Sequence, residues 1–201
     1  MAGVKMDQAS NLDLVYNLAQ LLKERVGATR RLAVETPLLA LYSEDGDRVE
    51  AHDLKGEVKV TRLTDGLLVQ GDIEAQVALE CSRCLDDFLL PVDASLEEQF
   101  QPSIDIESGH PIKRAEFDLD DNIFMLDPNH LMDLTEPIRQ ALLVALPMRP
   151  LCREDCKGLC SVCGANRNYV DCGHVEEQTD SRWVGLRDLD IADFPADRNM
   201  N

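Results

Sequence analysis

The sequence predicts an α+β protein, in which an antiparallel β-meander is packed by helices and followed by a small cysteine-rich C-terminal loop. Three observations support this class. Apolar residues alternate through most of 58–92, which favours paired strands with one buried face. Apolar residues recur at helical spacing in 11–26 and 135–146. Five of the seven cysteines fall within 151–174.

The N-terminal part is expected to begin with a helix over 11–26. Its leucines have helical spacing, and Gly27 stands where a C-terminal cap belongs. A strand over 30–35 should follow and end at Pro37.

The meander is the clearest secondary-structure signal. Strands are expected from Glu57 to a hairpin turn at Asp65-Gly66, and again over 67–80. The alternation resumes over 88–92 after a turn that holds two cysteines.

A second helix is expected from about Thr135 to Leu146. It follows the acidic stretch 101–130, which is typical of a loop holding one short strand. Asp133 and Thr135 mark its start, and Pro137 lies in the first turn, where proline is tolerated. The expected organisation is an α+β domain (1–146), a cysteine-rich segment (147–174), and a short helix with an acidic tail (175–201).

The net charge of −18 limits the choice of partners. Such a field repels phosphate backbones and anionic lipid and attracts basic proteins. Aromatic residues make up only 4%, which disfavours a surface for stacking nucleic-acid bases. We expect no membrane partner.

The first ten residues, MAGVKMDQAS, lack an apolar signal core, and no aliphatic run could span a bilayer. We therefore expect a cytoplasmic protein. Cytosolic thiols are kept reduced, so clustered cysteines indicate metal rather than disulfides.

The cysteine-rich segment contains a pattern typical of a zinc knuckle. Cys160 and Cys163 are two residues apart, and Gly164 follows, where the turn needs a positive φ. Sulfur ligation favours a structural Zn²⁺. Six residues compete for four ligand positions. The expected ligands are Cys152, Cys156, Cys160 and Cys163. The reserves, either of which could replace Cys152 or Cys156, are Cys172 and His174.

Catalysis is not expected. The surplus of ligands predicts a closed site, whereas catalytic zinc keeps an open position. The four histidines lie in unrelated segments, and no nucleophile–base constellation is visible. The sequence therefore predicts neither an enzyme nor a small-molecule substrate.

Cys81 and Cys84 form a second Cys-x2-Cys pair, with no further cysteine nearby. They could be half of a metal site completed by a partner or by the distant cluster, a redox dithiol, or two half-buried thiols in a hairpin turn. Arg83 between them could pair with Asp86 or Asp87, or contact a partner or phosphate.

Taken together, ALECSRCLDDF, LLVALPMRPLC and CREDCKGLCSVCGANRN resemble, in their order, the YceD family of large ribosomal RNA subunit accumulation proteins. AQLLKERVGATRRLAVE and DSRWVGLRDL, the second similar to a short closing helix, extend the resemblance. It implies a cytoplasmic, non-enzymatic factor needed for normal levels of large-subunit rRNA. Ser161, in place of the usual proline, and Arg167 depart from the family pattern without removing a ligand.

The expected partners are a ribosomal protein, an assembly factor or a large-subunit rRNA precursor. Because the cysteine-rich segment is the least acidic region, partner contact is expected there and at the first pair. The residues expected to make it are Arg83, Arg153, Lys157 and Arg167. The alternative is a general interaction module or chaperone for a basic client; a hydrolase or thiol enzyme is less expected.

Overall fold

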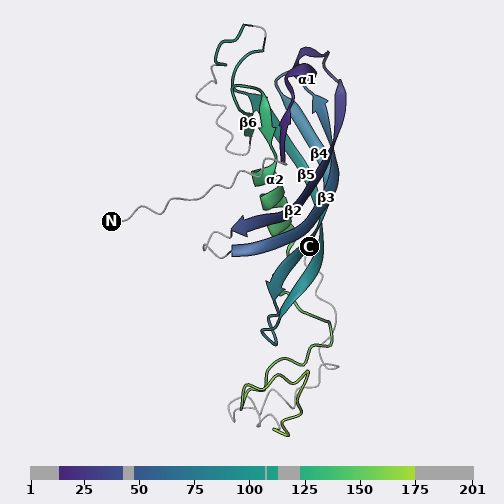
Figure 1. Ribbon diagram of the computed structural model, residues 1–201, viewed down its shortest axis with the longest axis vertical. Coiled ribbons are helices and arrows are strands. Elements are labelled where there is room, and N and C mark those ends of the chain that lie inside the picture. Colours follow the sequence, from purple (N-terminus) through teal and green to yellow (C-terminus); the bar gives the residue numbers. More distant parts are fainter. Residues whose placement is uncertain (1–13, 43–47, 107, 113–122, 175–201) are drawn as a thin grey trace, which may run out of the picture. The chain divides into compact units, whose positions relative to one another are not determined.

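The computed structural model describes residues 14–42, 48–106, 108–112 and 123–174 (Figure 1). The chain divides into two compact units, Met1–Cys156 and Lys157–Asn201. The expected boundaries at residues 146 and 174 stay predictions. The expected closing helix lies outside the described residues.

Unit 1 is mostly β-structure. Four long strands form an antiparallel meander in chain order, and a short fifth strand pairs parallel with the end of β5. The alternation over 58–92 predicted the last three of the four, and the structure adds β2 to the same sheet. The sheet is curled (Figure 1). The strands of this sheet are β2 (Thr29–Tyr42), β3 (Arg48–Arg62), β4 (Leu67–Glu80), β5 (Asp87–Pro102) and β6 (Phe124–Leu126).

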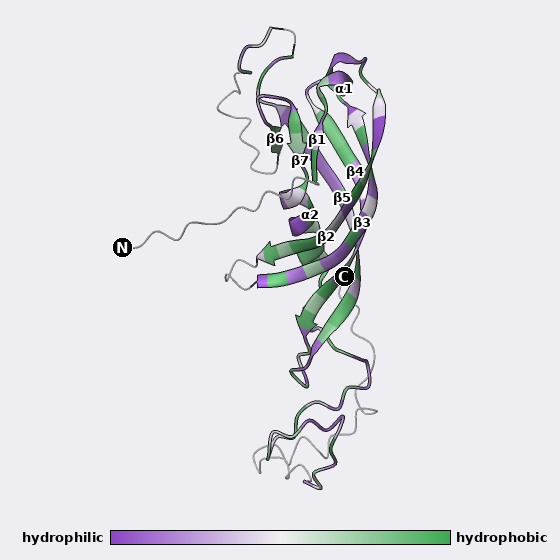
Figure 2. Ribbon diagram, viewed as in Figure 1, coloured by the Kyte–Doolittle hydropathy of each residue, from purple (hydrophilic) through white to green (hydrophobic). Residues whose placement is uncertain are grey.

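The inner face of the sheet carries the core. Along β4, buried Val69, Ile73 and Val77 alternate with more exposed polar residues, and the same alternation runs along β3 and β5. Figure 2 shows it as alternating colours along the strands. Burial of these side chains provides the main driving force for folding.

Helix α2 (Thr135–Ala145) covers part of this core, as expected. It buries Ile138 and Leu142 and packs against β5 and β2. The Asp133 side chain accepts a hydrogen bond from the Thr135 N–H at 2.8 Å, which satisfies one of the unpaired donors of the first turn.

The N-terminal helix prediction is wrong for most of its length. Within the described part, β1 (Val15–Asn17) pairs antiparallel with β7 (Leu131–Asp133), and α1 (Ala19–Lys23) is a short helix. The leucines that suggested a helix are buried all the same. Pairing with a distant strand therefore outweighed the local periodicity.

Pro37 does not end its strand. β2 lies at the edge of the sheet, and its pairing with β3 skips Pro37 and Asp53, which has a φ of 52°. An edge position with an irregular ladder tolerates a residue that lacks an N–H group.

The strands β3 and β4 approach closely at Gly71. A Cβ atom there would lie 2.3 Å from the carbonyl oxygen of Glu57 and 2.8 Å from Cα of Val58. Only glycine fits this approach without a backbone shift.

Unit 2 is described over residues 157–174. This stretch forms turns and one isolated bridge, Leu159 with Asn166, and no helix or strand. It buries few side chains, chiefly Cys160. Its described part therefore has almost no hydrophobic core of its own.

Candidate metal centres

All seven cysteines and one histidine gather into two groups of four. Within each group the ligand atoms all lie within 4.8 Å of one another. Group one belongs to unit 1 and group two to unit 2. Group one is Cys81, Cys84, Cys152 and Cys156. Group two is Cys160, Cys163, Cys172 and His174.

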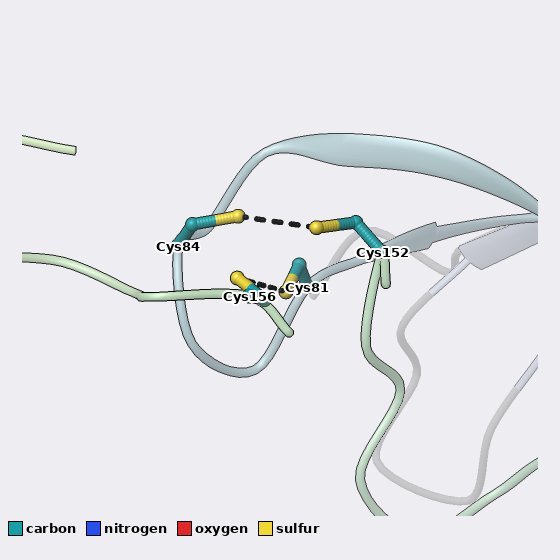
Figure 3. Close-up of side chains that lie close together, drawn as sticks. All are labelled: Cys81, Cys84, Cys152 and Cys156. Carbon is teal, nitrogen blue, oxygen red and sulfur yellow. Dashed lines mark hydrogen bonds between the residues drawn. The ribbon is translucent and has the colours of Figure 1, made fainter. Parts of the chain in front are cut away.

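Group one joins two segments far apart in the chain. Cys81 and Cys84 lie in the turn between β4 and β5, and the other two cysteines follow α2. The side chains point toward one another (Figure 3). The sulfur of Cys81 lies 3.8 Å from that of Cys156, and the sulfur of Cys84 lies 3.7 Å from that of Cys152. None of these cysteines is in a disulfide.

The two Cys-x2-Cys turns share one backbone geometry. In the first, the N–H of Leu85 donates to the carbonyl of Cys81 at 2.9 Å, and the N–H of Cys81 donates to the carbonyl of Asp86 at 3.0 Å. In the second, Gly164 donates to Cys160 at 2.9 Å, and Cys160 donates to the carbonyl of Ala165 at 2.8 Å.

The N–H groups around the sulfurs also correspond. The sulfur of Cys81 accepts from the N–H groups of Arg83 and Cys84, two and three residues later. The sulfur of Cys160 accepts in the same way from Val162 and Cys163. Both turns therefore have the N–H to sulfur bonds that stabilise thiolates in metal-binding knuckles.

Non-cysteine contacts hold the two halves of group one together. The Ser82 N–H donates to the carbonyl of Pro150 at 2.9 Å. The Arg83 guanidinium donates to the carbonyl of Cys156 at 3.0 Å and to that of Glu154 at 3.4 Å. Phe88 and Leu151, flanking the cysteines, pack against them.

Group two is held by its own short loops. Gly158 and Gly173 have φ values of 69° and 67°, so glycine is required at bends before the knuckle and between the last two ligands. The Asn168 side chain accepts from the Lys157 N–H at 2.9 Å, and the Arg167 N–H donates to the Gly158 carbonyl at 2.9 Å. These bonds close the loop that carries the ligands.

The thiols of each group differ in acidity. Burial raises the pKa of Cys81, but N–H groups donated to its sulfur outweigh burial and lower that pKa to about 6. Backbone N–H groups likewise lower the pKa of Cys160 to about 6. The Asp86 N–H lowers the pKa of Cys84, but burial and the neighbouring thiols raise it to about 12. Burial, followed by the Cys156 thiol, raises the pKa of Cys152.

The four ligands grouped by sequence are thus divided by the structure. Cys152 and Cys156 lie with the first pair, and Cys160 and Cys163 lie with both reserves. The sequence left open that the distant cluster completes the first pair. It did not indicate the knuckle geometry there, because Leu85 occupies the position where glycine signals a knuckle.

The basic residues expected to contact a partner have different surroundings. The Arg83 guanidinium donates to the backbone carbonyls of Glu154 and Cys156. Its pairing with Asp86 or Asp87 stays a prediction. Arg153 and Asp155 form an ion pair at 3.5 Å near the surface. Lys157 and Arg167 are exposed. Partner contact by any of the four stays a prediction.

Comparison with known proteins places the chain in a family of ribosome-related factors. The family described as large ribosomal RNA subunit accumulation protein YceD matches residues 69–190, a range that includes both groups. An uncharacterized Mycobacterium tuberculosis protein is 31% identical over 66% of this chain and 60% of its own length. A Mycobacterium leprae protein, also uncharacterized, is 28% identical over 87% of this chain and 76% of its own length.

The large ribosomal RNA subunit accumulation protein YCED homolog 1 of maize, a chloroplastic protein, is 28% identical over 55% of this chain and 44% of its own length. The chain spans about 60% of the length of the first mycobacterial relatives. No solved structure matches it. The chain belongs to the YceD family, as its motifs suggested.

The family description names an accumulation factor for large-subunit rRNA rather than an enzyme. Among the helices that the structure describes, none is long and apolar enough to cross a membrane.

Proposed function

We propose that this protein is a non-enzymatic ribosome-biogenesis factor that supports the accumulation or maturation of large-subunit rRNA. The observation that carries the proposal is the family match over 69–190, because it covers nearly all of β4, the whole of β5 and α2, and both cysteine groups. The protein acts in the cytoplasm through contacts with a ribosomal protein, an assembly factor or the rRNA precursor itself.

We further propose that the cysteine groups bind structural Zn²⁺. Ligand sets of sulfur, or of sulfur with one imidazole, favour zinc, and four protein ligands leave no open position for catalysis. Bound zinc would hold the loops in shape and add folding free energy.

Partner contact is proposed at the basic side chains near the cysteines, which are Arg153, Lys157 and Arg167. A group of basic side chains is unusual in a chain whose net charge is −18. Arg83 supports the proposal less well, because its guanidinium already donates to the backbone of 154–156.

The decisive experiment is depletion of the protein in its own organism. The ratio of large-subunit to small-subunit rRNA should fall and recover when the intact gene is restored. A restored gene in which Arg153, Lys157 and Arg167 are all changed to Glu should not recover the ratio. A control gene in which Lys55 and Lys59 on the sheet are changed to Glu should recover it. An rRNA ratio that depletion leaves unchanged would overturn the proposal.

A second candidate is a chaperone or interaction module for a basic client. Exposed acidic residues face one another across the sheet, with Glu57 opposite Asp72 and Glu74 opposite Asp93. Two cations lie beside them, because Arg31 forms an ion pair with Glu57 at 2.8 Å and Lys55 lies opposite Glu74. Like charges so placed repel unless a basic partner covers them. Purification at mild salt separates the candidates, since a biogenesis factor should bring down large-subunit precursors and a general module should not.

A further inference from the structure

We propose that each chain binds two metal ions, and that group one is a complete four-thiolate site fastening the β4–β5 turn to the segment after α2. The sequence indicated a single site, with the first cysteine pair outside it. The inference deepens the proposed metal binding and does not depend on a role in rRNA accumulation.

The distances in group one fit a tetrahedral ion. A zinc–sulfur bond of about 2.3 Å places the sulfurs of a regular tetrahedron about 3.8 Å apart. The two sulfur–sulfur distances recorded here are 3.8 and 3.7 Å, and the remaining pairs lie within 4.8 Å. A disulfide would need about 2.05 Å. An iron–sulfur cluster would hold the four sulfurs farther apart, because several atoms lie between them.

Packing as small apolar side chains does not account for the group. A thiol that packs as a hydrophobe needs no donors, yet the sulfur of Cys81 accepts from three backbone N–H groups, including that of Cys152. The Asp86 N–H similarly donates to Cys84. Four sulfurs within 4.8 Å of one another, with backbone N–H donors directed at two of them, suit a metal ion better than apolar packing.

The two halves of the site are brought together by contacts other than the ligands. Ser82 and Arg83, which separate the first two cysteines, bind the backbone of Pro150 and Cys156. Cys81 and Cys156 are 75 residues apart in sequence, so an ion here closes a long loop of the chain. The site is therefore preorganised, and its ion locks a junction that the protein has already formed.

Group two is a separate site because it shares no ligand with group one. Three thiols and the His174 imidazole supply four ligands, and its Cys160 turn repeats the knuckle geometry of Cys81. The seven cysteines and this histidine thus divide into two complete tetrahedral sets.

The test measures metal in the purified full-length chain. Zinc per chain is determined by mass spectrometry for the wild type, Cys84→Ser, Cys152→Ser, Cys163→Ser and the control Ser82→Ala, which keeps its N–H bond. We expect two ions in the wild type and control and one in each cysteine variant. With cobalt(II) as the probe, Cys163→Ser should retain a four-thiolate spectrum, while Cys84→Ser should retain one shifted by the imidazole ligand.

A measurement on the intact wild type guards against variants that fail to fold. X-ray absorption at the zinc edge reports the mean coordination per ion. Seven sulfurs and one nitrogen shared by two ions should give a mean of 3.5 sulfurs and 0.5 nitrogens per ion. One ion per chain, bound by three sulfurs and a nitrogen, would overturn the proposal. So would a zinc content that Cys84→Ser and Cys152→Ser leave unchanged. Neither result bears on the rRNA ratio, which tests the proposed function alone.

Discussion

Leu85 and Gly164 occupy the same position in two turns of the same construction. Each follows the second cysteine of a Cys-x2-Cys pair, with φ values of 60° and 70°, and each donates its N–H to the carbonyl of the first cysteine at 2.9 Å. One position is filled by the residue best suited to the left-handed region and the other by leucine, which is disfavoured there. The shared backbone geometry is a more specific similarity between the two turns than their common Cys-x2-Cys spacing.

The first prediction concerns this position. Gly164→Ala should weaken metal binding at group two by about 1–2 kcal/mol, roughly tenfold, because alanine is strained at a φ of 70°. Among the described residues, apart from its two chain neighbours, no atom lies within 4 Å of the added methyl, so the cost comes from the backbone conformation. Competition with a chromophoric chelator measures the affinity. The control, Ser161→Ala in the same turn, should not change it; equal losses in both would contradict the account.

The second prediction tests the junction at group one. Arg83→Ala should lower metal affinity there about fivefold to tenfold, since it removes bonds to the backbone around Cys156 while keeping all four ligands. Arg83→Lys should recover part of the loss. Arg153→Ala is the matched control, because the interaction that the described residues show for the Arg153 side chain is a long ion pair near the surface. An effect of Arg153→Ala as large as that of Arg83→Ala would argue against a specific anchoring role.

Removal of metal should affect the two units unequally. After chelation, trypsin should cut rapidly at Lys157 and Arg167, because the described part of unit 2 has little buried surface apart from its ligands. Cleavage at Lys55 and Lys59 should stay slow, because the sheet of unit 1 has its own core. Peptide mapping over time measures both. Equal acceleration at all four sites would show that the sheet also depends on metal.

Arg139 should contribute to stability in a pH-dependent way. It donates to both carboxylate oxygens of Glu136, at 2.7 and 2.5 Å, and to the Tyr42 carbonyl at 2.6 Å, which ties α2 to the end of β2. Arg139→Ala should lower the free energy of unfolding by about 1 kcal/mol at neutral pH, because the carboxylate is half exposed. Thermal melts should show a Tm about 2–4 °C lower.

The hydrogen bonds from Arg139 hold the pKa of Glu136 below its ordinary value of 4.5. A depressed carboxyl pKa stabilises the fold above the pKa of the unfolded chain, and this contribution is lost as pH falls through the folded pKa. The difference between wild type and Arg139→Ala should therefore shrink below about pH 4.5 and leave a remainder from the Tyr42 contact. A difference that stays constant down to acid unfolding would refute the assignment.

Gly71→Ala should destabilise the sheet by about 1–3 kcal/mol, because the methyl would meet the backbone of Glu57 and Val58. Denaturant unfolding measures the change. Gln70→Ala, at the neighbouring half-buried position of β4, should cost less. A Gly71 variant as stable as the wild type would mean that the two strands can separate there without loss.

Local pattern predicted much of the meander and the second helix. The alternation along β4, the Asp65-Gly66 turn and the start of α2 at Thr135, whose N–H bonds to Asp133, depend on neighbours in the chain, so their signals survive in a single sequence. In the N-terminal segment the same dependence on neighbours in the chain led to a wrong prediction. Its spacing suits a helix, but β1 pairs with β7, more than a hundred residues away.

By itself the sequence determined which residue types could bind a metal, the Cys-x2-Cys-Gly spacing at Cys160, and the family to which the chain belongs. Only the tertiary structure decided how the ligands divide. Proximity in sequence grouped Cys152 and Cys156 with the knuckle that follows them, whereas the fold places them beside Cys81 and Cys84. The meander and α2 bring these two parts of the chain together. Ser82 and Arg83 then bind the backbone of Pro150 and Cys156, and no local sequence pattern encodes these hydrogen bonds.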